Sequence, residues 1–125
     1  MSNVIVWADI PVTDIDRARK FYAHLLGNEI PLMPGIDGVA LLMPPGTGSP
    51  DDVSADLVQS SDTPSTNHGA TVYLNSNGDI VGMLARAVEA GGKVISEPEN
   101  MGEMVGWVAF FEDSEGNRVG LHQPA

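Results

Sequence analysis

Few residues of this chain are of types that perform chemistry directly. The 125 residues include three histidines and no cysteine, so disulfides, thiolate metal sites and cysteine nucleophiles are excluded by composition. The sequence has no Ser-His-Asp motif and no glycine-rich phosphate loop after a strand. The candidates for acid–base catalysis are Asp9 and His122, a carboxylate and an imidazole on predicted strands. For His122 the alternative is a structural position at the edge of a sheet.

Alternation along the predicted strands adds candidates for ligand binding. Val119 and Leu121 are apolar and should face a helix, which places Arg118 and His122 on the opposite, open face. The same reasoning assigns to open faces the side chains of Trp7, Asp9, Asp56, Thr71 and Tyr73. Trp7 could instead lie in the core or in a dimer contact, since tryptophan is common at both kinds of surface.

Acidic residues dominate the charge. Seventeen Asp and Glu against six Lys and Arg give a formal net charge of −11, spread evenly over both halves of the chain. Such a field repels nucleic acid and anionic lipid and is compatible with a cationic ligand. No apolar run approaches the roughly 18 to 20 residues of a membrane span, and the first residues show no basic leader. We therefore expect a cytoplasmic protein with no nucleic-acid or membrane partner.

Two helices and a series of short strands must position these candidates. Apolar residues recur at three- and four-residue spacing from Ile15 to Leu26, after a possible cap at Thr13 or Asp14 and before Gly27, which predicts a helix. A second stripe, at residues 80, 84, 87 and 88, predicts another helix that closes at glycines 91 and 92. The predicted strands are 4–12, 29–33, 39–43 and 53–58 in the first half, and 70–74, 93–96, 107–111 and 118–122 in the second. A loop is predicted at residues 44–50.

The two halves repeat each other. Ile10 matches Val72, Gly27 matches Gly91, and GVAL at 38–41 matches WVAF at 107–110, with an offset that grows slowly, as loop insertions produce. Each half has one helix and four strands, so its sheet should pack the helix on one face and leave the other free. Two such free faces would line a concave cleft, the usual place for a ligand.

Two motifs carry a family resemblance. VTDIDRARKFYAHLLG at 12–27 and FFEDSEGNRVGLH at 110–122 resemble the vicinal oxygen chelate superfamily, which includes glyoxalase I, extradiol dioxygenases and bleomycin-resistance proteins. The resemblance implies an α+β fold of two tandem βαβββ modules, whose curved mixed sheet surrounds a cleft. It makes residues 1–125 a single domain, with modules at 1–58 and 68–125 joined by a linker at 59–67.

The resemblance also predicts where a metal would be bound. Metal-dependent members place a His or Glu on the first strand of each module and a Glu or Gln on the last strand. The corresponding positions here are Trp7, Gly69 or Thr71, and Gly120. None of these is a useful metal ligand, and a different site would have to use Asp9, Asp56 and His122, with His68 at its edge. We expect no metal and no other cofactor.

The segment from Glu97 to Gly106 has two methionines, three glutamates and two glycines between strands. Similar proteins place a flexible flap over the cleft here, and methionine side chains adapt to varied apolar ligands. Met101 and Met104 are therefore added to the predicted ligand-binding residues. A plain surface loop is the alternative.

These expectations favour a small-molecule-binding protein of the glyoxalase/bleomycin-resistance type, metal-free and homodimeric as similar proteins are. One alternative is a glyoxalase-like lyase or isomerase acting on a small oxygenated substrate, with Asp9 or His122 moving the proton. Another is an accessory or regulatory dimeric domain without catalysis. The fold alone does not decide among them.

Overall fold

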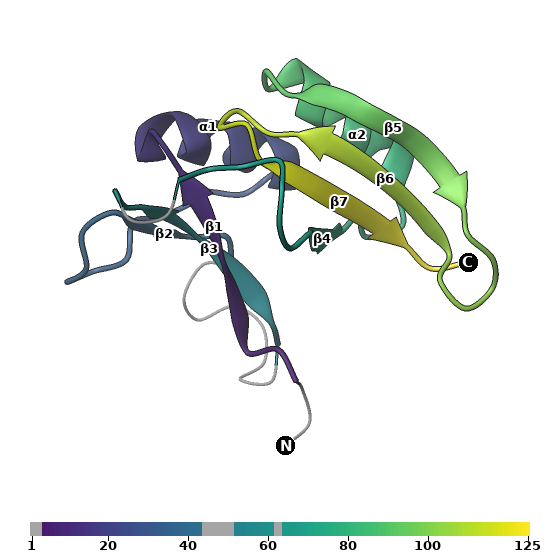
Figure 1. Ribbon diagram of the computed structural model, residues 1–125, viewed down its shortest axis with the longest axis horizontal. Coiled ribbons are helices and arrows are strands. Elements are labelled where there is room, and N and C mark those ends of the chain that lie inside the picture. The colour runs from purple at the N-terminus through teal and green to yellow at the C-terminus, as the bar shows by residue number, and fades with distance from the viewer. Residues whose placement is uncertain (1–3, 44–51, 62–63) are drawn as a thin grey trace.

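The computed structural model describes residues 4–43, 52–61 and 64–125, which form two similar halves, each a sheet with a helix (Figure 1). The first half contains β1 (Trp7–Val12), α1 (Ile15–Leu26), β2 (Val39–Leu41) and β3 (Ser54–Gln59). The second contains β4 (Val72–Asn75), α2 (Ile80–Glu89), β5 (Lys93–Asn100), β6 (Trp107–Glu112) and β7 (Arg118–Gln123). The expected α+β architecture of mixed sheets and two helices is confirmed.

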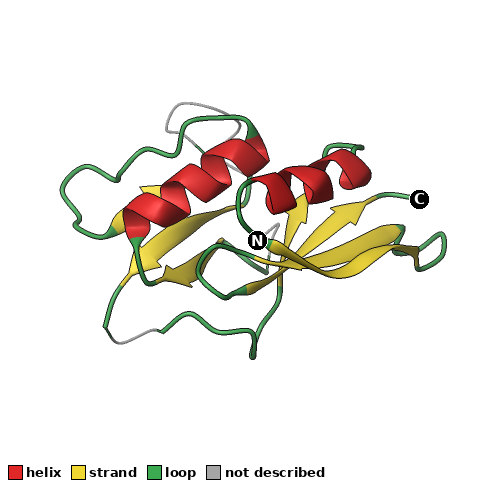
Figure 2. Ribbon diagram, turned by 90° about the horizontal axis from the view of Figure 1, so that it is seen from above, coloured by secondary structure: helices red, strands yellow, loops and turns green. Residues whose placement is uncertain are grey.

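In each half, the strand that comes first along the chain lies next to the strand that comes last. In sheet A the order is β1-β3-β2, and in sheet B it is β4-β7-β6-β5. The β1–β3 and β4–β7 pairs are parallel and the remaining pairs antiparallel. A parallel pair needs a crossover connection, and each half places its helix in that connection. Both helices cover the same side of the sheets, which leaves the other side open (Figure 2).

Helix α1 begins and ends where the sequence predicts. The Asp14 carboxylate caps it by accepting hydrogen bonds from the backbone N–H groups of Asp16 and Arg17, at 3.1 Å each. Gly27 ends it with a φ of 74°, a left-handed conformation that glycine adopts without strain. The predicted stripe of α2 is confirmed at residues 80, 84 and 87, whereas Val88 is exposed and residue 83 is buried in its place.

The core lies between the helices and the inner faces of the sheets. Alternate residues of β1, β3 and β6 are buried there, as the sequence pattern requires. The largest fully buried side chains are Tyr22, Phe21, Phe111, Leu25, Ile30, Leu57, Leu121, Val12 and Val119. None of the helices in the described residues is long and apolar enough to cross a membrane.

The predicted strand at residues 29–33 is wrong. This segment makes one isolated bridge, between Leu32 and Ala40. Pro31 has no N–H to donate to a neighbouring strand, although its carbonyl accepts a hydrogen bond from Leu41 at 2.9 Å. Pro34 limits the pairing on the other side for the same reason. In its described residues the first half therefore has three strands where the sequence predicted four.

Other strand limits also differ from the predicted ones. β1 begins at Trp7 and not at residue 4, because Ser54, the first residue of its neighbour β3, lies opposite Trp7. β2 ends at Leu41 rather than residue 43. β3 continues through Gln59, into the segment assigned to the linker, and β5 continues to Asn100 rather than ending at residue 96. The loop predicted at residues 44–50 lies outside the described residues.

Glu115, in the turn between β6 and β7, joins the second half to the start of α1. Its carboxylate accepts hydrogen bonds from the backbone N–H groups of Thr13 and Asp14, at 2.9 and 2.8 Å, and from the Arg17 guanidinium, at 2.6 and 2.9 Å. Burial raises the pKa of Glu115, but the hydrogen bonds that it accepts, above all from Arg17, outweigh burial and leave this pKa below its ordinary value. An ionised carboxylate is therefore held at the N-terminus of a helix, where the helix dipole also favours it.

Asn117, in the same turn, extends this contact to two more segments. Its amide nitrogen donates to the Pro11 carbonyl at 2.6 Å and to the Asp113 carboxylate at 3.0 Å, and its oxygen accepts from the Thr66 N–H at 3.0 Å. The hydroxyl of Tyr22 donates to Asp113 at 2.6 Å. Burial, together with the charge of Asp113, raises the pKa of Tyr22 well above its ordinary value. These buried hydrogen bonds fix the position of one half against the other.

Candidate functional site

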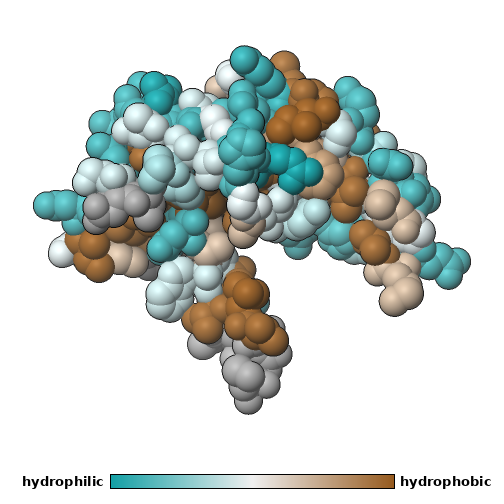
Figure 3. Space-filling model, viewed as in Figure 1, coloured by the Kyte–Doolittle hydropathy of each residue, from teal (hydrophilic) through white to brown (hydrophobic). Residues whose placement is uncertain are grey.

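A cavity of about 610 Å³ lies between the two halves, beside the edge strands β1 and β4. One wall comes from β1, the start of β3 and the end of α1, and the other from β4 and the residues next to it. The lining residues are Ile5, Trp7, Ala8, Leu26, Asn28, Leu42, Val53, Ser54, Ala55, Ala70, Thr71, Val72, Tyr73, Leu74, Asn75 and Asn77. In Figure 3 the molecule is an arch, hollowed between the projecting end of sheet A and sheet B. The volume is that of a site for a drug-sized molecule.

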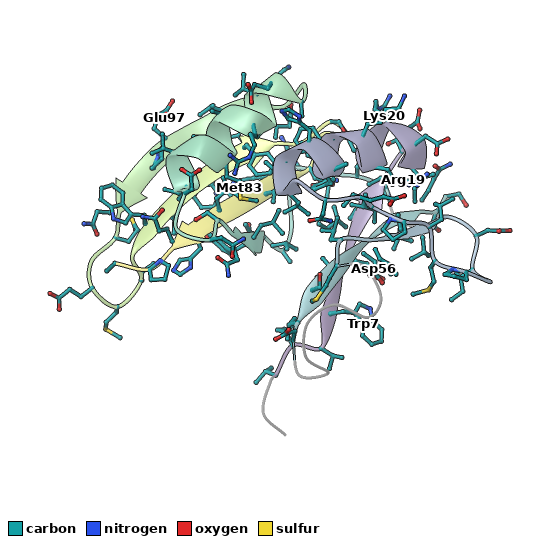
Figure 4. The ribbon with its side chains drawn as sticks, turned by 180° about the vertical axis from the view of Figure 1, so that it is seen from behind. Trp7, Arg19, Lys20, Asp56, Met83 and Glu97 are labelled. Carbon is teal, nitrogen blue, oxygen red and sulfur yellow. The ribbon has the colours of Figure 1, made fainter. Side chains whose placement is uncertain are left out.

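Three of the predicted ligand-binding residues, Trp7, Thr71 and Tyr73, line this cavity. Trp7 is 63% exposed and Tyr73 51%, and both are among the residues that line the cavity. Figure 4 shows Trp7 and Asp56 on the projecting end of sheet A, away from the helix that carries Arg19 and Lys20. Exposed aromatic surface in the lining of a cavity suits an apolar ligand.

Asp9 and Asp56 lie side by side on the open face of sheet A, directly opposite each other in the pairing of β1 with β3. Burial raises the pKa of Asp56 above its ordinary value, and the nearby carboxylate of Asp9 raises it further. Two like charges on adjacent strands are unfavourable, so this pair costs stability unless a cation or a shared proton relieves it. Neither residue is among those that line the cavity.

Arg118 forms a cluster with Thr71, Phe110 and Tyr73 on the open face of sheet B. Its Nη1 donates a hydrogen bond to the Thr71 hydroxyl oxygen at 2.8 Å, and its Cζ lies 3.9 Å from the centre of the Phe110 ring. The Tyr73 ring packs edge-on against Phe110, with 5.6 Å between ring centres. Arg118 itself is outside the cavity lining, but two members of the Arg118 cluster belong to it.

The other predicted residues lie away from the cavity. His122 Nε2 is 2.5 Å from the Val105 carbonyl oxygen, which ties the imidazole to the loop between β5 and β6. Met101, in that loop, is half-exposed and Met104 is fully exposed, and neither lines the cavity. Within the described ranges, no hydrogen bond or ion pair joins Asp9, in sheet A, to His122, in sheet B. The flap, the catalytic candidates and the binding residues stay predictions.

The residues at the family's metal-ligand positions do not fit a metal ion. The Tyr73 ring covers Gly120 so closely that a Cβ atom added to Gly120 would lie 2.5 Å from Tyr73 Cδ1. A carboxylate side chain at this position would need the ring to move. Trp7 offers an indole, and the remaining position offers only Gly69 or the Thr71 hydroxyl. In the part of the chain that the structure describes, no group of three or more His, Asp or Glu is placed to hold a metal ion.

Sequence reasoning missed several residues of this region. Leu26, Asn28 and Leu42 line the cavity from the helix side, and the helical pattern had given Leu26 only to the core. Phe110, the ring under Arg118, could have been found, because it alternates with Ala109 and Phe111, which are fully buried. That alternation places Phe110 on the open face beside Arg118.

Comparison with known proteins identifies the family. The profile of the Glyoxalase/Bleomycin resistance protein/Dioxygenase superfamily matches residues 4–121. A glyoxylase-like domain-containing protein of Didymella fabae is 31% identical over 113 residues, which are 87% of this chain and 84% of the relative. The chain therefore belongs to the glyoxalase/bleomycin resistance protein/dioxygenase superfamily, and the resemblance seen in its motifs is confirmed.

Solved structures agree on the fold. A glyoxalase/bleomycin resistance protein from Albidiferax ferrireducens T118 superposes with a TM-score of 0.74 at 18% identity, over 98% of this chain and 100% of the other. TnmS3, an antibiotic binding protein from Streptomyces sp. CB03234, is 27% identical with a TM-score of 0.65, over 100% of this chain and 99% of its own.

Proposed function

We propose that this protein binds a small, largely apolar organic molecule in the cavity between its halves, without a metal ion. The observation that carries the proposal is the cavity of about 610 Å³, which has the exposed aromatic residues Trp7 and Tyr73 among its lining. The likeness to TnmS3, an antibiotic binding protein, supports the same kind of function. A shaped, mostly apolar space with a few polar groups is what ligand recognition requires.

The packing of Tyr73 over Gly120 supports the metal-free part of the proposal, since this ring fills the space that a metal-binding side chain would need. We expect zinc and nickel titrations followed by calorimetry to show no stoichiometric binding, and a chelator to leave ligand binding unchanged. Tight binding of one metal ion per chain would contradict this part.

Turnover of methylglyoxal with glutathione that survives a chelator and is lost in Asp9→Asn or His122→Ala would favour the enzyme alternative.

A homodimer is part of the same proposal. Val4, Ile5, Val6, Trp7 and Val53 form an N-terminal apolar patch, in which each residue is 44% to 88% exposed. Contiguous apolar surface of this kind commonly marks an interface, and covering it with a second copy would also close one end of the cavity. Light scattering during gel filtration tests this, and a monomer at all concentrations would contradict it.

We propose a cytoplasmic location on composition alone, and cell fractionation tests it.

A thermal-shift screen of aromatic compounds tests the binding proposal, followed by affinity measurements on variants. Trp7→Ala and Tyr73→Ala should each weaken binding of a confirmed ligand by about tenfold or more, because each removes aromatic surface from the cavity lining. Val81→Ala is the control, since Val81 is 70% exposed on α2 and outside the cavity lining. The proposal fails if no compound binds saturably, or if both aromatic variants bind as tightly as the control.

A further inference from the structure

Arg118 differs from the other three arginines of the chain in its partners. Arg17 pairs with Glu115 at 2.6 Å, Arg19 with Asp16 at 3.5 Å, and Arg86 with Asp79 at 3.6 Å. Within the described ranges, no carboxylate oxygen lies within 4.0 Å of the Arg118 guanidinium. Lys20 and Lys93 likewise have no carboxylate within 4.0 Å among the described residues, but Arg118 is the cation of these three that contacts a residue of the cavity lining. Among the described residues, the Arg118 guanidinium therefore forms no ion pair.

A carboxylate, that of Glu112, lies on the strand next to Arg118, yet the two side chains form no ion pair. Glu112 lies directly opposite Arg118 in the pairing of β6 with β7, and both residues belong to the open face. The guanidinium instead lies over the Phe110 ring, on the side of Thr71 and β4. The side chain is thus directed along the sheet toward the cavity wall, although a carboxylate stands next to it in the register.

The contacts that hold Arg118 leave most of its donors free. A guanidinium has five N–H donors, and in the described structure one N–H bond, to Thr71, is made. The Phe110 ring covers one face of the guanidinium by a cation–π contact, which fixes the plane without using the N–H groups along its edge. An arginine fixed in this way is preorganised to bind a planar carboxylate with two parallel hydrogen bonds.

The hydroxyl groups of Thr71 and Tyr73 add to this donor set. The oxygen of Thr71 accepts from Arg118, so its own hydrogen is free to point at another acceptor, and no acceptor for it or for the Tyr73 hydroxyl is found in the described part of the chain. Thr71 and Tyr73 line the cavity while Thr71 touches Arg118. A ligand in the cavity would therefore meet donors at this end and apolar walls over the rest.

We propose that Arg118, with the Thr71 hydroxyl, binds the carboxylate of a small aromatic acid whose ring lies in the cavity. The inference rests on the proposed function and names the chemical class of the ligand. Because the net charge of −11 repels anions at a distance, the attraction must be local, and moderate salt should not abolish it. The carboxylate adds to the apolar contact of the ring and selects acids over their neutral analogues.

The test compares carboxylates with their carboxamides. Benzoate, 2-naphthoate and indole-3-acetate are titrated against the full chain in about 0.15 M salt, together with the matched neutral amides, by calorimetry and by NMR of the Arg118 Nε–H signal. We expect at least one acid to bind about tenfold or more tightly than its amide and to shift that signal. Arg118→Gln should remove this preference, and Arg118→Lys should restore only part of it, because a lysine lacks the two-pronged geometry.

Arg86→Gln is the matched control, since it removes one positive charge from α2, away from the cavity, and should keep the preference for acids. Should Arg118→Gln fail to fold, Thr71→Val removes one donor and should still reduce the preference. Equal binding of acids and amides, or a preference that survives Arg118→Gln, overturns the carboxylate subsite while the proposed binding function stands. Absence of saturable binding by every acid and amide overturns the carboxylate subsite, whereas the proposed binding function fails with it only if no compound of the aromatic screen binds.

Discussion

At the scale of single residues, the contacts of the Glu115 carboxylate have a structural role. The Glu115 side chain is fully buried, and it accepts four hydrogen bonds from three residues at the start of α1. A buried charge is tolerable only when it is paired. If the Glu115 charge is removed, the Arg17 guanidinium loses its counter-charge, and the two backbone N–H groups lose part of the acceptor that they share. The residue that the family motif places in a turn thus acts as a connector between the halves.

Glu115→Gln should therefore lower the free energy of unfolding by about 2 to 4 kcal/mol at neutral pH. Urea unfolding followed by circular dichroism measures it. Glu89→Gln is the matched control, because Glu89 is exposed and its one ion pair is a surface pair with His24 at 3.4 Å among the described residues. We expect this substitution to change the free energy of unfolding by less than about 0.5 kcal/mol. Equal effects of the two substitutions would show that the Glu115 contacts contribute little.

The pH dependence of that difference has a defined sign. The pKa of Glu115 is lower in the folded state than its ordinary value of 4.5, so the folded state favours the ionised form. The stability that Glu115 contributes is fully present above pH 4.5 and is lost as the pH falls through the lower, folded-state pKa. The gap between the native protein and Glu115→Gln should accordingly be constant from neutral pH down to that region and shrink below it. A gap that widens on acidification would contradict this assignment.

At the scale of elements, the contact between β4 and β7 determines what the open face of sheet B can hold. Tyr73 lies opposite Gly120 in the parallel register, and its ring occupies the space above the glycine. Gly120 does not have a positive φ, so the backbone itself would accept a side chain there. Gly120 is therefore needed because the Tyr73 ring leaves no room for a side chain, and not because the backbone conformation demands glycine.

Gly120→Ala should therefore cost about 1 to 3 kcal/mol in the native background, because the new Cβ overlaps the Tyr73 ring. In a Tyr73→Ala background the same change should be neutral or stabilising, since alanine loses less backbone entropy than glycine in a strand. A double-mutant cycle of unfolding free energies measures the coupling. Additive effects would mean that the ring moves aside freely and that Gly120 remains open to a larger side chain.

How far the sequence predicts these elements depends on whether the signal is local. A cap at Thr13 or Asp14, the end at Gly27 and the open-face position of Arg118 follow from short-range patterns, and the structure agrees with each of them, with Asp14 as the cap. The segment at 29–33 forms no strand, because Pro31 within it and Pro34 directly after it have no N–H to donate to a neighbouring strand. The Tyr73 ring over Gly120 and the orientation of Arg118 toward Thr71 depend on side-chain packing between strands far apart in sequence, which no local pattern encodes.

At the scale of the whole molecule, the two halves share their stability although each has its own sheet. α1 packs against α2 as well as against sheet A, and the turn at residues 113–117 hydrogen-bonds to β1, to α1 and to Thr66. Half of a 125-residue chain is too small to bury a sufficient core on its own. The cavity between the halves can keep its shape only if both halves remain folded together.

Unfolding should therefore be a single cooperative transition, and the two tryptophans allow each half to be followed separately. Trp107→Phe leaves Trp7 as the reporter of the first half, and Trp7→Phe leaves Trp107, which packs against the core, as the reporter of the second. For each variant, the urea midpoint from tryptophan fluorescence should coincide with the midpoint from circular dichroism, which reports on both halves. Glu115→Gln, added to either variant, should shift both midpoints together, because its contacts join the halves. Two separated midpoints would mean that the halves fold independently, and the cavity would then be a gap between two domains rather than a preformed binding site.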